Sequence, residues 1–334
     1  MTMKALQLSK EKELHLIDVE GPSLKDGEVL VKVMASSLNH REIWISKGLY
    51  PGMTLPCILG ADGAGKVVKV GPNVESKWLN KEVIIYPAYD WGSNPEIPLK
   101  QFRVLGMPDP GTLAEYIAVP ETNLHIKPAF LTWEEAAALP VAYLTAWRAL
   151  KVLGRVKEDD RVLITGVGGG VAQAGLAFAV SLGAKVYVTS SSDIKIEDAV
   201  SLGAKGGVNY KDENWPTLLK ELSQGIDIVL DSSPLPILDD YLKFLSMGAR
   251  IVAYGSTGSR KTTLNISKFF LRHIQFIGTA MGSPTDFQNM LDYMEISEIK
   301  PRIHKVFSLT DTIGAIKELE SGNQIGKFVI SQVD

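Results

Sequence analysis

The stretch from Val162 to Gly175, VLITGVGGGVAQAG, decides the fold. An apolar, β-branched run leads into four glycines within five residues, and an alanine-rich segment follows them: Gly166, Gly168, Gly169 and Gly170. This order predicts a strand, a tight turn and a helix, in which Val171 begins the apolar helical run. The first amides of such a helix have no intrahelical acceptor, and together with the helix dipole they favour a pyrophosphate.

The spacing within this turn is that of a dinucleotide-binding fingerprint. Gly166, Gly169 and Ala172 recur every three residues, and alanine is allowed at the last position because that position needs only close packing of helix on strand. A glycine-rich turn by itself is as consistent with no ligand as with a bound dinucleotide. The strands and helices that alternate on both sides favour a bound cofactor.

The next strand, KVYVTS, predicts which dinucleotide binds. NAD-binding domains carry an acidic residue about 20 residues after the glycines, where it holds the ribose 2′-hydroxyl. Here the strand runs into hydroxyl-bearing residues: Thr189, Ser190, Ser191 and Ser192. With Lys195 just beyond, they suit a 2′-phosphate, so NADP(H) is favoured over NAD(H). Asp193 is counter-evidence, although it also suits a helix N-terminus, and Lys195 could equally be a solvated helix residue.

Length and composition set limits on the class of protein. With 334 residues, two domains are expected. The chain has 35 basic and 38 acidic side chains, a balance that offers no basic surface for nucleic acid or for an anionic membrane. Cys57 is the sole cysteine, flanked by apolar residues, and is expected to be buried and inert. The N-terminal segment MTMKALQLSKEKEL lacks the apolar run of a secretory signal, and we expect a cytoplasmic protein without membrane spans.

The pattern of elements changes near residue 128. Before it, short β-rich runs separated by glycines predict a partly closed, mostly antiparallel sheet, with a long surface loop over residues 88–110. After it, a capped helix starts at Thr132, and strands then alternate with helices over residues 171–182, 193–202 and 238–247. This alternation predicts a doubly wound parallel sheet. Helices over residues 285–294 and 310–320 and strands at HKVFSL and KFVISQV close the chain.

Several motifs in this order resemble the medium-chain dehydrogenase/reductase superfamily, and its quinone oxidoreductase-like, zinc-independent branch in particular. They span nearly the whole chain: ILGADGAGKVVKVG, GTLAEYIAVP, EEAAALPVAYLTAWRAL, VLITGVGGGVAQAGLAFAVSLGAKVYVTSSSD, LGAKGGVNY and GKFVI. The resemblance implies a GroES-like catalytic domain over residues 1–127, completed by residues 279–334. A Rossmann domain over residues 128–278 would be inserted between them.

The residues at the family's zinc-ligand positions do not match that metal. Where zinc members place Cys, His-Glu and Cys, this sequence has Asn39, the pair Ala61-Asp62, and Val141. Catalytic zinc takes three protein ligands as a rule, and Asp62 with a stray His40 does not supply them. We therefore expect no catalytic zinc, and none of the four cysteines of a structural zinc loop is present. His40 is expected to be an exposed turn residue.

Without a Lewis acid, a conjugated acceptor is easier to reduce than a simple carbonyl, because the charge that arrives with the hydride is delocalised. Quinones and α,β-unsaturated carbonyls are thus the expected electrophilic small-molecule substrates. The resemblance implies a catalytic pocket made by Asn39, Trp44, Tyr50 and Asp62, with Trp44 standing where tyrosine is usual. It also implies cofactor contacts from the glycine turn and from other residues: Thr145, Ser190, Ser191, Ser192, Lys195, Tyr210, Tyr254, Gly255, Ser256 and Lys327.

Other functions remain open at this point. Tyr50 falls where the enoyl-thioester reductase branch has its proton-donating tyrosine, and ordinary packing is an equally good interpretation of that residue. A non-catalytic NADPH-binding scaffold or sensor and a zinc alcohol dehydrogenase are further alternatives. We expect a homodimer formed through the Rossmann edge near ARIVAYGS and IQFIGTA, and no nucleic-acid or membrane partner.

Overall fold

The computed structural model describes residues 1–333 and divides into two compact units. The first comprises Met1–Ala142 with Gly282–Asp334, and the second comprises Tyr143–Met281. The boundaries expected at 127/128 and 278/279 are therefore displaced, the first of them by 15 residues. The reason is α2 (Trp133–Ala137), which contacts the strands of the first unit. Thr132 caps α2 in a capping box with Glu135, as the sequence predicts.

The first unit is built on antiparallel strands, which confirms the expected GroES-like architecture. Its largest sheet has the order β10-β6-β5-β3-β18-β17, with β9 also paired to β3, and only the β17–β18 pair is parallel. A smaller sheet has the order β2-β1-β4. The strands are β1 (Thr2–Leu8), β2 (Leu14–Glu20), β3 (Glu28–Ser37), β4 (Cys57–Ile58), β5 (Asp62–Val70), β6 (Glu82–Ile85), β7 (Ala88–Tyr89), β8 (Arg103–Val104), β9 (Tyr116–Pro120), β10 (Leu124–Ile126), β17 (Ile303–Ser308) and β18 (Lys327–Ser331). The other helices of this unit are α1 (His40–Ser46), α8 (Pro284–Ser297) and α9 (Thr312–Glu320).

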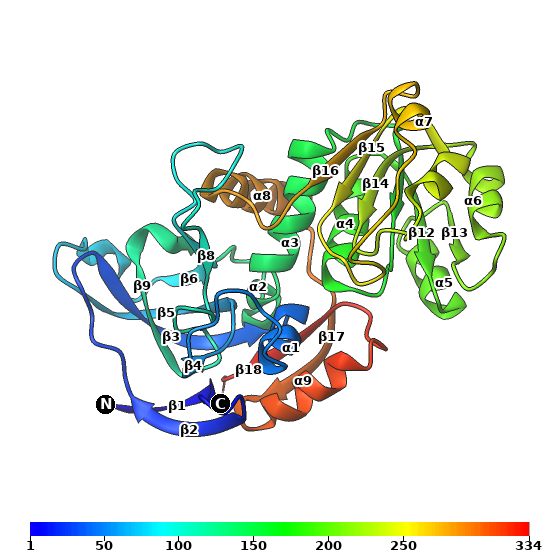
Figure 1. Ribbon diagram of the computed structural model, residues 1–334. Helices are drawn as coiled ribbons and strands as arrows, with labels where there is room; N and C mark the ends of the chain where they lie inside the picture. The colour runs from blue at the N-terminus through cyan, green and yellow to red at the C-terminus, as the bar shows by residue number, and fades with distance from the viewer. Residues whose placement is uncertain (334) are drawn as a thin grey trace. The chain divides into compact units, whose positions relative to one another are not determined.

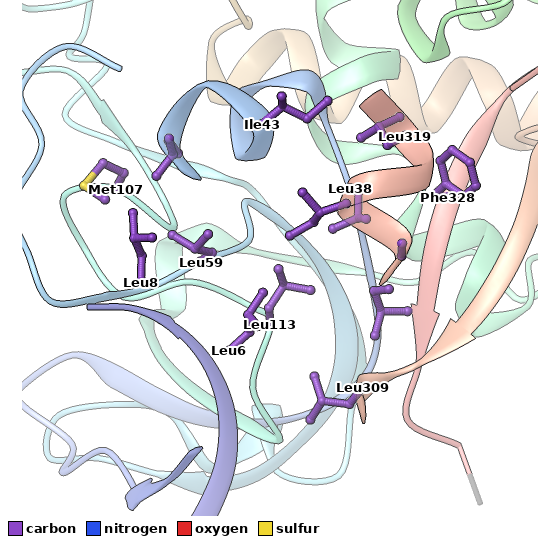
Figure 2. Close-up of a cluster of buried hydrophobic side chains, with 14 of the residues drawn as sticks. Leu6, Leu8, Leu38, Ile43, Leu59, Met107, Leu113, Leu309, Leu319 and Phe328 are labelled. Atoms are coloured by element: carbon purple, nitrogen blue, oxygen red, sulfur yellow. The ribbon is translucent and has the colours of Figure 1, made fainter. Parts of the chain in front are cut away.

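One apolar core in this unit is built from residues of both ends of the chain. Figure 2 shows Leu38 beside Leu319 of α9 and Phe328 of β18, and all three are almost fully buried. Cys57 belongs to the same cluster, and burial raises the pKa of its thiol to about 12. The expectation of a buried cysteine is confirmed, and the raised pKa favours an unreactive thiol.

Residues 88–110 are more ordered than the surface loop that the sequence predicts. β7 and β8 pair within this segment, and Trp91, Leu105 and Met107 are buried. Arg103 fastens it: the guanidinium is ion-paired with Asp90 and with Asp109, at 2.5 Å for Nε–Oδ2 of the latter. Its carbon Cζ also lies 4.9 Å from the centroid of the Tyr89 ring. Buried apolar side chains and this charged clasp explain why a Pro- and Gly-rich stretch folds back on the sheet.

Arg103→Ala should therefore loosen residues 88–110 selectively. Two ion pairs and a cation–π contact are lost together, so we expect a loss of about 1–2 kcal/mol in the free energy of unfolding. Amide hydrogen exchange should accelerate in this segment before it does elsewhere. Lys100→Ala, at an exposed position of the same segment, is the matched control. Equal exchange in both variants would show that the clasp contributes nothing.

The second unit is a six-stranded, wholly parallel sheet of order β13-β12-β11-β14-β15-β16, which confirms the Rossmann architecture (Figure 1). Its strands are β11 (Arg161–Ile164), β12 (Lys185–Ser190), β13 (Gly206–Asn209), β14 (Ile226–Asp231), β15 (Leu245–Ala253) and β16 (Gln275–Gly278). Its helices are α4 (Gly170–Ser181), α5 (Asp193–Ser201), α6 (Trp215–Ser223) and α7 (Ile266–Phe270). α3 (Pro140–Trp147) precedes them and continues as a π-helix over Arg148–Leu153.

One expected helix, over residues 238–247, is wrong. The structure has a six-residue 3-10 helix at Leu238–Lys243, and β15 begins at Leu245. Leu238, Tyr241 and Phe244 are buried, so their spacing imitates a helical face. Gly248, with φ +71°, lies inside β15 and marks an irregular strand instead of a helix end. None of the helices within residues 1–333 has the length and apolarity that a membrane crossing requires.

Candidate functional site

The glycine-rich turn lies where the sequence places it, between β11 and the start of α4. Gly166 adopts a left-handed conformation with φ +63°, and its amide donates to Thr189 Oγ1 over 3.3 Å. The Val167 amide donates to the Thr189 carbonyl over 3.1 Å, and Gln173 Nε2 donates to the Val167 carbonyl over 2.7 Å. These bonds hold the turn against β12. The first-turn amides of α4, from Gly170 to Ala172, donate to no backbone acceptor within residues 1–333.

Gly169, the N-cap of α4, has space that the protein itself does not fill. Its backbone, with φ −75° and ψ 155°, is open to any residue, and a Cβ built there would meet nothing nearer than the Gly166 carbonyl oxygen at 3.8 Å. Gly175 is the opposite case, since its Cβ would lie 2.3 Å from Leu230 Cδ2. Close helix-to-strand packing therefore falls at Gly175 and not at Ala172, the position expected from the spacing, although Ala172 is buried. The free space at Gly169 lies where the dinucleotide fingerprint predicts the pyrophosphate.

The residues expected on the adenosine side of the cofactor lie at the end of β12 and the start of α5. Ser190 is buried, and its Oγ accepts from the Ser192 amide over 3.2 Å, while Ser191 is half-buried. The Asp193 carboxylate, which could have bound a ribose, accepts from Asn209 Nδ2 over 2.9 Å. Partial burial lowers the pKa of Lys195 on α5. Tyr210 is exposed and its amide is bonded to the Ser190 carbonyl, so it lies at this same edge of the sheet.

Two further strand ends meet beside the glycine turn, and sequence reasoning missed their centre, Asp231. This buried carboxylate accepts from Thr165 Oγ1 and from the Ser233 amide, each over 2.9 Å, and from the Tyr241 hydroxyl. Burial raises its pKa. The Tyr254 amide donates to the Asp231 carbonyl, and Gly255 and Ser256 follow it, exposed, at the end of β15. An acidic residue closing the run IDIVLD was the available signal. Thr145, on α3, is buried.

In the first unit, strand pairing brings a second polar centre together. β3 pairs with β5 so that Ser37 lies opposite Asp62, and β18 pairs with β3 so that Val329 lies opposite Ser37. Continuing that antiparallel register by two residues sets Lys327 beside Asn39. Three distant segments thus converge on one carboxylate.

Asp62 is completely buried and both of its oxygens are used. Oδ2 accepts from Ser37 Oγ over 2.7 Å, from Asn39 Nδ2 over 2.8 Å and from Lys327 Nζ over 3.0 Å. Oδ1 accepts from the Val141 amide over 2.8 Å. Lys327 Nζ also donates to Asn39 Oδ1 over 2.6 Å. We name these side chains, Ser37, Asn39, Asp62 and Lys327, the polar centre.

The polar centre does not fit a catalytic zinc ion. The groups that could ligate a metal ion are one carboxylate, one amide and one hydroxyl. The fourth member, the Lys327 ammonium, is 3% exposed and already donates hydrogen bonds to the carboxylate and to the amide. Zinc sites use thiolate, imidazole and carboxylate, three of them as a rule. Within residues 1–333, no three His, Cys, Asp or Glu side chains gather as metal ligands would. Lys327, expected to contact the cofactor, belongs by its bonds to this centre, and the cofactor contact stays a prediction.

Helix α1 carries the remaining expected residues of the pocket. Asn39 is its N-cap and is half-buried, and the Asn39 amide donates to Glu42 Oε2 over 2.7 Å. Trp44 is 37% exposed, and Tyr50 is half-buried against the apolar core with the Arg41 guanidinium 5.0 Å from its ring centroid. His40 is exposed, as expected, but it is the first residue of α1 and does not lie in a turn. Partial desolvation of its ring and, next, the Lys327 charge lower its pKa.

Glu42 is a buried acid that sequence reasoning did not single out. Burial raises its pKa, and the Arg41 guanidinium and the bond from Asn39 oppose this only in part. Its Oε1 is 3.5 Å from Arg41 Nη1 and accepts no hydrogen bond within residues 1–333. The spacing of Asn39 and Glu42, three residues apart, is the capping-box signal that could have revealed it.

Glu42→Gln should change how stability depends on pH. Because the pKa of Glu42 is raised in the folded state, the folded protein binds more protons than the unfolded chain between the two pKa values, and stability falls as pH rises through that window. Glutamine keeps an acceptor for the Asn39 amide and removes this slope. Urea unfolding at several pH values from 4 upward measures it, with Glu295→Gln, exposed on α8, as the control. A variant that is less stable by the same amount at every pH would contradict the raised pKa.

The comparisons with known proteins agree with both units. Residues 25–129 match the family described as alcohol dehydrogenase GroES-like domain, and residues 170–295 match the zinc-binding dehydrogenase family. The chain is 35% identical over 337 residues to the zinc-type alcohol dehydrogenase-like protein YogA of Leptosphaeria maculans, covering 95% of this chain and 94% of that protein. It is 27% identical over 343 residues to the acryloyl-coenzyme A reductase of Sulfurisphaera tokodaii, covering 98% and 99%.

The crystal structure of an NAD-dependent alcohol dehydrogenase superposes on 98% of this chain and 99% of its own, with a TM-score of 0.91 at 34% identity. Matches of this length cover both units and the return of the chain to the first of them. The chain therefore belongs to the medium-chain dehydrogenase/reductase superfamily of nicotinamide-dependent oxidoreductases.

Proposed function

We propose that this protein is an NADPH-dependent reductase of quinones or α,β-unsaturated carbonyl compounds that works without zinc. The observation that carries the proposal is the polar centre. The amide of Asn39 stands where zinc members of the superfamily have a ligand, and the buried Lys327 ammonium is bonded to it and to Asp62. The half-buried Asn39 is the member of the centre nearest to solvent.

The chemistry of the proposed reaction suits this centre. The nicotinamide, when bound, supplies the hydride. Asn39 Nδ2 donates one of its two hydrogens to Asp62, and the second has no acceptor within residues 1–333. That hydrogen can bind a substrate carbonyl oxygen as negative charge develops on it. An enolate or a hydroquinone anion needs less stabilisation from the protein than a localised alkoxide, because its charge is delocalised, so a single neutral donor can suffice for it.

The cofactor preference rests on the end of β12. Ser190, Ser192 and Lys195 offer hydroxyls and a cation to a 2′-phosphate, whereas the Asp193 carboxylate is engaged by Asn209. A ribose 2′-hydroxyl would lack its usual acidic partner here. NADP(H) is accordingly proposed over NAD(H), even though the related crystal structure is of an NAD-dependent enzyme.

A specific observation also favours an enoyl-thioester reductase as a second candidate. The acryloyl-coenzyme A reductase is similar over nearly the full length of both chains, and Tyr50 lies on the same segment as Asn39 with no hydrogen bond from its hydroxyl to residues 1–333. In this candidate Tyr50 donates the proton, and Tyr50→Phe should reduce turnover of an enoyl thioester without changing NADPH binding.

The deciding experiment follows NADPH and NADH oxidation with 1,4-benzoquinone, an alkyl enone and crotonyl-CoA, and titrates both nucleotides by calorimetry. We expect turnover of the quinone or enone, a higher kcat/KM with NADPH, and full activity after dialysis against a chelator. Turnover of crotonyl-CoA alone would favour the thioester reductase. Tight NADPH binding with no turnover would favour a scaffold or sensor, and loss of activity on dialysis with recovery on adding zinc would overturn the proposal.

We further propose that the protein acts in the cytoplasm as a homodimer. β16 is one of the two edge strands of the Rossmann sheet, and Phe276 on it is 45% exposed. An exposed edge with an apolar side chain is suited to pairing with a second copy. Light scattering on the wild type and on Phe276→Lys tests this, and a wild-type monomer would contradict it.

A further inference from the structure

We propose that the Lys327 ammonium balances the charge of Asp62 and that it fixes and polarises the Asn39 amide that holds the substrate oxygen. Lys327 is thus a positioning residue. This inference rests on the proposed role of Asn39 and extends it to Lys327, the first residue of β18.

The hydrogen bonds allow the Asn39 amide only one orientation. Its oxygen faces the Lys327 ammonium at 2.6 Å, and its nitrogen faces the Asp62 carboxylate at 2.8 Å. A flipped amide would set NH₂ against the ammonium and oxygen against the carboxylate, and both contacts would be repulsive. The ion pair therefore decides that Asn39 presents a donor, and not an acceptor, to a bound substrate.

Asp62 itself is closed to substrate. It accepts four hydrogen bonds, three at Oδ2 and one at Oδ1, and is fully buried. Its charge is matched by Lys327, so the centre is neutral as a whole. Lys327 is also almost fully buried, whereas Asn39 is half-buried. A substrate oxygen therefore reaches the amide hydrogen of Asn39 before it reaches the ammonium.

The ammonium also strengthens that donor. A hydrogen bond to the oxygen of an amide draws electron density from its nitrogen, and linked hydrogen bonds in a medium of low dielectric reinforce each other by about 10–30%. Because Lys327 is 3% exposed, water does little to screen its charge. The chain Lys327, Asn39, substrate oxygen thus carries part of the positive field that a metal ion would apply directly.

Two variants at position 327 test the inference. Lys327→Ala leaves room beside Asp62, while Lys327→Met fills the volume without a charge. Both should lower kcat for the accepted quinone or enone at least about tenfold. A higher KM for NADPH with an unchanged kcat would support the expected cofactor contact of Lys327 instead and would overturn the inference. Ammonium chloride should raise the melting temperature of Lys327→Ala and restore part of its kcat, and it should do neither for Lys327→Met. Sodium chloride at equal ionic strength is the salt control.

A neutral pair separates positioning from simple charge balance. Lys327→Met combined with Asp62→Asn removes both charges, so its melting temperature should recover towards that of the wild type while its kcat stays low. Recovery of kcat in this double variant would overturn the inference, as would wild-type kcat in Lys327→Met or equal effects of ammonium on both single variants.

The melting-temperature measurements need no substrate, so they distinguish this inference from the proposed function. If the wild type reduces none of the acceptors, the proposed function fails. The role of Lys327 as the counter-ion of Asp62 is then still tested by whether ammonium raises the melting temperature of Lys327→Ala. If the wild type is active and ammonium raises only the melting temperature of that variant, the function stands and the polarising role of Lys327 is overturned.

Discussion

Gly169→Val is expected to weaken NADPH binding at least about 100-fold, or about 2.8 kcal/mol, while the unliganded protein loses no more than about 1 kcal/mol of stability. The backbone at Gly169 accepts a side chain, and the nearest heavy atom to a Cβ is 3.8 Å away, so the fold tolerates the change. The side chain then occupies the space that the pyrophosphate needs beside the first-turn amides of α4. Calorimetric titration and the thermal shift produced by NADPH measure the two effects separately.

Gly175→Ala is the matched control for that variant, because it should do the reverse. A Cβ there comes within 2.3 Å of Leu230 Cδ2, so overpacking should cost about 1–3 kcal/mol of stability. Nucleotide affinity at a temperature where the variant is folded should stay near that of the wild type. If Gly169→Val bound NADPH as the wild type does, the glycine turn would not be the pyrophosphate site.

Asn39→Ala is expected to lower kcat for a conjugated carbonyl acceptor about 10²- to 10³-fold, the usual effect of removing one donor to a developing oxyanion. The substitution also removes an acceptor from Lys327 and a donor from Asp62, so we expect a loss of about 1–3 kcal/mol in stability. Steady-state rates below the melting temperature of the variant separate the two effects. NADPH affinity should not change.

Ser37→Ala provides the comparison, because the Ser37 hydroxyl donates to Asp62 Oδ2 and contacts neither Asn39 nor Lys327 through any hydrogen bond of its side chain. It should destabilise the same buried carboxylate and leave kcat within a few-fold of the wild type. Equal losses of kcat in the two variants would mean that the rate depends on the integrity of the centre and not on the Asn39 donor.

Local sequence patterns predict most of the fold. Strands and helices alternate along the second unit with glycines at the turns, and that order alone predicts the parallel sheet. The pattern misled at residues 238–247, where buried Leu238, Tyr241 and Phe244 have helical spacing but the chain turns into β15 after six residues. The first compact unit continues to Ala142, beyond the expected residue 127, because packing of α2 on its strands leaves no mark in the local sequence.

The candidate site also has one part that local sequence motifs predict and one part that they do not. The glycine turn and the hydroxyl-rich end of β12 are contiguous in sequence, so a motif can indicate them. The polar centre joins Asp62 to Lys327, 265 residues apart, through the registers of β3, β5 and β18. No spacing rule covers that distance, and the family resemblance identified Asn39 and Asp62 without showing that a lysine binds both.

The place of β18 in the chain has a consequence for how the enzyme matures. A ribosome completes Tyr143–Met281 as one continuous stretch before it makes Lys327, so the nucleotide-binding unit can fold while the other half still lacks an internal strand of its largest sheet. Until that strand inserts between β3 and β17, Asp62 has no counter-ion. On the proposed role of Lys327, a chain that has not yet made β18 could fold its second unit and would still lack the group that orients the Asn39 amide.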